Sequence, residues 1–176
     1  MTYYKLTNQN LQTYDGFQWT VGKWEGTNGA GELCSPGWLH CYDDKLLAVL
    51  LNPIHANIQN PRLFRVDVSG KKKTNNGLKF GFSKMRLVEE IPLPGISTIQ
   101  RGAFGILCAL TLPNNATAFI KWSNDWLSGK DRSEAVAWDA SRAVAWDAAW
   151  AAESDAAWAA ATINLKQIAR QAMRVT

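Results

Sequence analysis

Apolar and polar residues alternate over several short stretches in the first half of the chain. The clearest case is residues 63–69, where Phe64 and Val66 alternate with Arg65 and Asp67. A period of two is typical of a strand with one buried face. Similar apolar or aromatic runs bounded by turn residues predict further strands at residues 3–6, 17–21, 38–42, 78–82 and 85–91.

Helical spacing of apolar residues begins after residue 96. Ser97 is followed three residues later by Gln100, which is a capping box and predicts a helix as far as residue 110. A second apolar face predicts a helix over residues 116–127. Earlier in the chain, a short helix over residues 44–51 is expected, with Asp43 as its cap.

The last part of the chain has the composition of a helix. Residues 131–176 contain neither Gly nor Pro, and 16 of residues 133–176 are Ala. A motif containing Trp138 recurs eight residues later at Trp146, an interval that overshoots two helical turns by about 80°. The Trp residues therefore spiral around the axis of a long Ala/Trp-rich helix over residues 131–174, which we expect either to break into two helices or to be contacted from several sides.

Together these elements predict an α+β protein. Residues 1–95 form a body with a small mixed or antiparallel sheet and short helices, and residues 96–176 form an all-helical C-terminal part. No linker composition separates the two, so we expect them to pack as one unit. The spiralling Trp residues also favour a homo-oligomer that uses the C-terminal helix.

Charge limits the classes of partner. The 176 residues carry a net charge of +4, with a pI near 9.0. Residues 1–132 hold 15 Lys+Arg against 10 Asp+Glu, so an anion site is expected in the body. The excess is too small to predict nucleic-acid binding. No apolar run has the ~18 residues that a membrane span needs, and the first residues lack a targeting pattern.

Candidate chemistry in the body is sparse. Cys34, His40, Cys41 and His55 do not have zinc-ligand spacing, and no motif supports Cys34 or Cys41 with His40 as a nucleophile pair. Three cysteines suit a reduced cytoplasmic protein. No phosphate-binding loop occurs, so we expect no cofactor and no metal. The lysines of residues 71–73 are expected in a solvated hairpin-like turn over residues 70–76.

Several segments resemble an uncharacterised domain family that is widespread in phage and prophage genomes. The shared motifs are Val-Gly-Lys at 21–23, Leu-Cys-Ser-Pro-Gly-Trp-Leu-His-Cys-Tyr at 33–42 and Phe-Arg-Val-Asp-Val-Ser-Gly at 64–70. Residues 52–57 and 121–133, with the Ala/aromatic tail, are similar to the phage branch. The resemblance implies a phage origin, in the cytoplasm of an infected bacterial host, and carries no established activity.

A looser similarity is to the ADP-ribosyltransferase type of fold, in which a His on an early strand and a Glu on a late strand hold NAD. The matching positions are His40 and either Glu89 or Glu90. This similarity implies an NAD-using enzyme as one alternative function.

The leading hypothesis is a phage counter-defence protein without catalytic activity. A basic, aromatic-rich body suits a small anionic nucleotide immune signal, which the protein would sequester. A third hypothesis is a protein-interaction module that acts through the helical tail. The residues expected to stack on the ligand or hold its phosphates are Trp19, Trp24, Trp38, His40, Arg62, Arg65 and Lys79.

Overall fold

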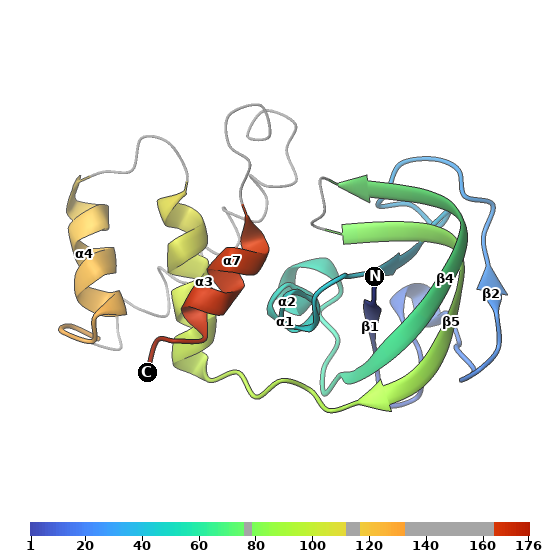
Figure 1. The fold of residues 1–176 in the computed structure, drawn as a ribbon, viewed down its shortest axis with the longest axis horizontal. Helices are drawn as coiled ribbons and strands as arrows, with labels where there is room; N and C mark the ends of the chain where they lie inside the picture. Colours follow the sequence, from blue (N-terminus) through green and yellow to red (C-terminus); the bar gives the residue numbers. More distant parts are fainter. Residues whose placement is uncertain (76–78, 112–116, 133–163) are drawn as a thin grey trace. The chain divides into compact units, whose positions relative to one another are not determined.

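The computed structural model describes residues 1–75, 79–111, 117–132 and 164–176. These residues form two compact units, Met1–Pro94 and Gly95–Thr176. The first unit carries the described sheet, whereas the described secondary structure of the second is helical (Figure 1). The predicted α+β class is therefore confirmed.

Five antiparallel strands form one sheet in the first unit. Their order is β1-β4-β5-β2, and β3 pairs with β5 beside this path. The strands are β1 (Tyr3–Thr7), β2 (Glu25–Gly26), β3 (Leu39–Cys41), β4 (Arg62–Asn75) and β5 (Lys79–Ile91). The strands predicted near residues 3–6, 38–42 and 63–69 are confirmed, and those predicted at 78–82 and 85–91 are one continuous strand from Lys79 onward.

A backbone bridge between Tyr4 and Tyr42 closes this sheet into a small barrel. The Tyr4 N–H donates to the Tyr42 carbonyl at 2.7 Å, and the Tyr42 N–H donates to the Tyr4 carbonyl at 2.9 Å. Because Tyr42 directly follows β3, the strands β1, β4, β5 and β3 are hydrogen-bonded in a ring. Closure removes the unpaired edges that β1 and β3 would otherwise present to other chains.

The long β4–β5 hairpin pairs with β1 on one side of the barrel and with β3 on the other, because it bends near Gly70. Its register shifts between Ser69 and Lys72, and Gly70 has a φ of +80°, in the left-handed region that favours glycine. A bulge of this kind bends and twists a strand without ending it. The predicted turn over residues 70–76 is therefore wrong for residues 70–75, which continue β4.

Residues 17–21 do not form the predicted strand. Gln18 makes one isolated bridge to Gln12, whereas Trp19 is drawn into the barrel core. Trp19 fills the barrel and Phe17 packs against it, whereas Val21 is exposed. The core contains buried side chains from the strands and from Trp19: Tyr3, Trp19, Leu39, Cys41, Phe64, Val66, Phe80, Phe82, Met85 and Leu87.

Two short helices pack beside the barrel: α1 (Lys45–Leu50), which contacts β1, and α2 (Asn52–His55) (Figure 1). The cap of α1 is Asp44, whose carboxylate accepts from the Leu46 N–H at 2.8 Å. The prediction of Asp43 as cap is wrong by one residue. A 3-10 turn, Tyr14–Gly16, lies in the loop that follows β1.

The second unit contains α3 (Thr98–Leu110), α4 (Thr117–Leu127) and α7 (Leu165–Ala172). The predicted capping box of α3 is confirmed, since the Gln100 N–H donates to Ser97 Oγ at 3.1 Å and the Ser97 N–H donates to Gln100 Oε1 at 3.0 Å. Both other helices contact α3. None of the described helices is long and apolar enough to cross a membrane.

Most of the predicted Ala/Trp-rich helix, residues 133–163, lies outside the described residues. At the described ends of the predicted range, residues 131–132 are not helical and Asn164 caps the separate helix α7. One uninterrupted helix over residues 131–174 is therefore excluded, and a break, which is one of the two expected alternatives, occurs at Asn164. The Trp spiral and the homo-oligomer stay predictions.

Candidate functional site

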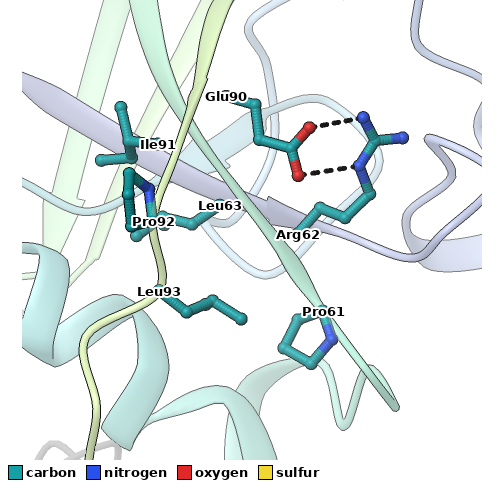
Figure 2. A pocket seen from close by; sticks show the side chains of 7 residues that line it. All are labelled: Pro61, Arg62, Leu63, Glu90, Ile91, Pro92 and Leu93. Carbon is teal, nitrogen blue, oxygen red and sulfur yellow. Dashed lines mark hydrogen bonds and ion pairs between the residues drawn. The ribbon is translucent and has the colours of Figure 1, made fainter.

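A pocket of about 420 Å³ lies where the start of β4 meets the end of β5. The two strands are antiparallel, so Leu63 pairs with Ile91 and the residues flanking these ends come together. Its walls combine one ion pair with apolar side chains: Pro61, Arg62, Leu63, Glu90, Ile91, Pro92 and Leu93 (Figure 2). Such a mixture of apolar wall and a few polar groups is typical of small-molecule sites.

The charged wall is a two-point ion pair between Arg62 and Glu90. Arg62 Nε lies 3.0 Å from Glu90 Oε1, and Nη2 lies 2.6 Å from Oε2 (Figure 2). Two further contacts orient the guanidinium, which donates from Nη1 to the Gln9 carbonyl at 3.3 Å and lies 5.3 Å above the Phe64 ring. Arg62 is therefore held in place even if the carboxylate moves away.

The pair is strong in geometry but accessible to solvent. The Arg62 side chain is 28% exposed and that of Glu90 is 46% exposed. Hydrogen bonding to Glu90 raises the pKa of Arg62, and Arg62 lowers the pKa of Glu90. Ion pairs exposed to this extent contribute little net stability, so an anionic ligand could replace the Glu90 carboxylate at small cost.

The next charged residues along the hairpin lie outside the pocket. Arg65 Nε lies 3.2 Å from Glu89 Oε1, and Arg86 Nη2 lies 2.7 Å from Asp67 Oδ2. The predicted phosphate contact Arg65 therefore belongs to a surface ladder of ion pairs, whereas the predicted contact Arg62 lines the pocket.

The three predicted stacking Trp residues lie apart from the pocket lining. Trp19 and Trp38 are 1% and 8% exposed, and neither presents an open ring face to a ligand. Trp38 instead donates its ring N–H to the Gly31 carbonyl at 3.1 Å. Trp24 is 43% exposed, with the Arg86 guanidinium 5.0 Å above its ring.

His40 and Lys79 lie on the outer face of the barrel, under residues 27–38. The His40 ring donates from Nε2 to the Leu33 carbonyl, and Lys79 Nζ donates to Cys34 Sγ at 3.1 Å. His40 pairs with Gly81 on β5. Gly81 lies eight residues before Glu89 on the same strand, which is roughly 26 Å measured along the strand. The structure therefore does not bring together the His and Glu of the NAD-enzyme hypothesis.

Burial, together with the nearby charge of Lys79, lowers the pKa of both His40 and His55, so these two histidines lie near the same lysine. Cys41 is separated from them. Cys41 lies in the barrel core, and alternation along β3 turns His40 to the opposite face. In the part of the chain that the structure describes, no three His, Cys, Asp or Glu residues are placed to hold a metal ion.

The three lysines lie on β4 and not in a turn, although Lys71 and Lys72 are exposed as expected. Lys71 and Lys73 fasten residues 27–38 to this strand. Lys71 Nζ donates to the Asn28 carbonyl at 3.4 Å. Lys73 Nζ donates to the Gly31 carbonyl and pairs with Glu32, at 3.1 and 3.0 Å. The bulge turns Lys72 the other way, with Nζ 5.0 Å above the Phe80 ring.

Two features escaped the sequence reasoning. Pro61 and Pro92 flank β4 and β5 and mark the strand ends that form the pocket. An antiparallel pairing of these two predicted strands would have brought the two prolines together.

The second feature is Lys5, which shares the inward face of β1 with Tyr3. Its Nζ donates to the His40 carbonyl at 2.8 Å. Burial lowers the pKa of Lys5 to about 8.

Acidification is expected to destabilise the first unit through His40 and His55. Burial lowers the pKa of His40 to about 4 and that of His55 to about 3, from 6.5. The unfolded chain therefore takes up protons first, and the free energy of unfolding falls as the pH drops from 6.5 towards 4. At about 1.4 kcal/mol per pKa unit, the loss through His40 is up to roughly 3 kcal/mol.

Urea unfolding between pH 7 and 5 measures this loss, since unperturbed carboxylates titrate mostly below that window. The matched variant is His40→Gln, which keeps a side-chain N–H for the Leu33 carbonyl but does not titrate. It should show a shallower pH slope than the wild type. An unchanged slope would rule out His40 as a source of the effect.

Comparison with known proteins places the first unit in a family. Residues 1–99 of the 176 match the model of a family described as a domain of unknown function (DUF7666). No curated protein and no solved structure matches the chain. The predicted membership in an uncharacterised domain family is confirmed, and the phage origin stays a prediction.

Proposed function

We propose that this chain, which belongs to the DUF7666 family, is a binding protein that holds a small organic anion in the Arg62–Glu90 pocket. The observation that carries the proposal is the pocket itself, in which an oriented, part-exposed guanidinium shares the lining with apolar side chains. A ligand with a phosphate or carboxylate beside an apolar or aromatic ring would satisfy both parts.

Binding would proceed by exchange of one anion for another. The Glu90 carboxylate marks where two acceptor oxygens of the ligand would lie, since phosphate and carboxylate both accept two parallel bonds from Arg. Gln9 and Phe64 keep the guanidinium in position during the exchange. The ring of the ligand would then cover the apolar side chains of Ile91 and Leu93, of which Leu93 is 42% exposed.

The biological role that we propose is counter-defence by a phage protein. The similarity of residues 52–57 and 121–133 to phage proteins supports the origin, and the positive balance of residues 1–132 supports an anionic target. Sequestration of a nucleotide immune signal needs affinity and no chemistry, which suits a pocket that contains a single ion pair. NAD-derived and cyclic nucleotides are therefore the first ligands to test.

Arg62→Ala is expected to weaken nucleotide binding about 10- to 100-fold, because a charge-assisted hydrogen bond contributes roughly 1.5–3 kcal/mol. Glu90→Gln is expected to strengthen binding about two- to fivefold, because the ligand no longer competes with a carboxylate. Titration calorimetry with NAD-derived nucleotides, cyclic nucleotides and inorganic phosphate measures both changes.

The matched controls are Arg65→Ala and Glu89→Gln, which remove a similar pair from the same two strands outside the pocket. Both should leave the affinity within about twofold of the wild type. Absence of binding for every nucleotide tested would overturn the proposal. The reverse pattern, with Glu90→Gln weakening binding, would assign the pocket to a cation.

No described contact favours the alternative ADP-ribosyl-transfer activity, because His40 on β3 pairs with Gly81, which lies far along β5 from Glu89 and Glu90. The interaction module rests on the tail, most of which lies outside the described residues. It stays a prediction, and loss of a pulled-down partner on truncation at Gly129 is its test.

A further inference from the structure

The three cysteines differ sharply in access to solvent. Cys41 and Cys108 are buried, and burial raises the pKa of each thiol to about 12. Cys34 is exposed, in the segment of residues 27–38 that covers the outer face of β5. It is therefore the thiol that a small oxidant in solution can reach.

A lysine amine lies directly against this thiol. Lys79 Nζ is 3.1 Å from Cys34 Sγ, although the two residues are 45 positions apart in the sequence. Lys79 is 7% exposed, so its amine is held beneath the covering segment instead of extending into water. An exposed thiol and a primary amine thus lie within the roughly 3–3.5 Å separation from which reacting atoms approach each other.

The surrounding contacts keep the two groups together. Just before Cys34 in the chain, the Gly31 carbonyl accepts from Lys73 Nζ and from the Trp38 ring N–H, both at 3.1 Å, and the Leu33 carbonyl accepts from the His40 ring. Lys79 begins β5 and is paired in the sheet. Both partners are therefore anchored to the same barrel, which raises the effective concentration of one at the other.

We propose that Cys34 and Lys79 form a reversible covalent cross-link when the protein meets a peroxide. Peroxide first transfers one oxygen to the Cys34 thiol, which gives a sulfenic acid and one water. The Lys79 amine, once its ammonium proton has passed to solvent, then attacks the sulfur, the sulfur–oxygen bond breaks, and hydroxide leaves with an amine proton as a second water. Sulfenic acids are known to condense with nitrogen in this way. The thiol loses two electrons, and the peroxide gains them.

The product is a sulfur–nitrogen bond that ties residues 27–38 to β5. It restricts the unfolded chain as a disulfide does, so the melting temperature of the oxidised protein should rise by about 10 °C. A thiol reductant returns both side chains to their original state. This cross-link is independent of the Arg62–Glu90 pocket, and its failure would leave the binding proposal untouched.

The test is peptide mapping of the full chain after treatment with hydrogen peroxide. The expected product is a linked pair of peptides that contain Cys34 and Lys79, lighter by about 2 Da than their sum and released by dithiothreitol. Cys41 and Cys108 serve as internal controls and should stay unmodified. Recovery of Cys34 solely as unlinked thiol or higher oxides would overturn the proposal, whatever the behaviour of the variants.

Two variants sharpen the result. Lys79→Arg keeps a cation but has no primary amine, so Cys34 sulfenic acid should accumulate and be trapped by dimedone several-fold more than in the wild type. Cys34→Ser should give neither adduct nor link. Equal dimedone labelling of wild type and Lys79→Arg would contradict capture of the sulfenic acid by Lys79.

Discussion

Trp19→Ala is expected to lower the free energy of unfolding of the first unit by roughly 3–5 kcal/mol. Trp19 is 1% exposed and fills the barrel core. Its ring lies 5.1 Å from that of Phe17, and its N–H donates to Thr13 Oγ1 at 3.0 Å. Truncation would leave a cavity and would also remove the aromatic face that lies 4.9 Å from the Lys5 ammonium.

Trp24→Ala is the matched control, because Trp24 is 43% exposed and its ring contacts Arg86 on the surface. Its expected effect is below about 1 kcal/mol. Urea unfolding followed by far-ultraviolet circular dichroism measures both variants. Similar urea midpoints for the two variants would contradict the place of Trp19 in the core. Trp19 would then again be a candidate for stacking on a ligand.

Gly70→Ala is expected to cost roughly 2–4 kcal/mol, the second largest effect. At a φ of +80°, an L side chain is strained by about 1–2 kcal/mol. A Cβ at this position would also lie 2.2 Å from Ser83 Oγ. Moving Ser83 away would break the bond that its hydroxyl accepts from the Lys71 N–H at 2.9 Å, which adds roughly 1–2 kcal/mol.

Gly22→Ala separates the two parts of this cost. Gly22 has a similar φ of +83°, but a Cβ there would meet nothing within 4 Å. It should therefore show the backbone strain alone, about 1–2 kcal/mol. Thermal or urea unfolding that gives equal losses at the two positions would show that Ser83 moves aside freely and that the bend of β4 does not depend on it.

The helices of this protein follow from local signals. The Ser97–Gln100 box and the apolar face behind it predict α3, because both depend on residues within a turn of each other. The strands were harder, because a strand is stabilised by partners distant in sequence. The alternation of residues 63–69 correctly predicts a strand. The bulge at Gly70, however, shifts the alternation of buried and exposed side chains, and β4 continues past it through Lys71 and Lys73.

The candidate site also combines features that the local sequence predicts with features that depend on contacts between distant residues. The sequence predicts Arg62 as a phosphate contact, since charge and strand position are local properties, and the structure places it in the pocket lining. Its partner Glu90 was instead assigned to a catalytic role, because nothing local indicates that the two oppose each other across a hairpin. Trp19 and Trp38 were expected to stack on a ligand, and only burial distinguishes them from the exposed Trp24.

The sequence by itself therefore determines the α+β class, the capping box of α3, the period of the strands and a net positive body, all of which depend on neighbouring residues. Tertiary structure alone decides that the sheet closes through Tyr4 and Tyr42, that Arg62 meets Glu90, and that Cys34 meets Lys79. Each of these pairs joins residues more than 20 positions apart. Such contacts form once packing of the whole barrel has fixed the register of the strands and the bulge in β4. No pattern of neighbouring residues in the sequence predicts them.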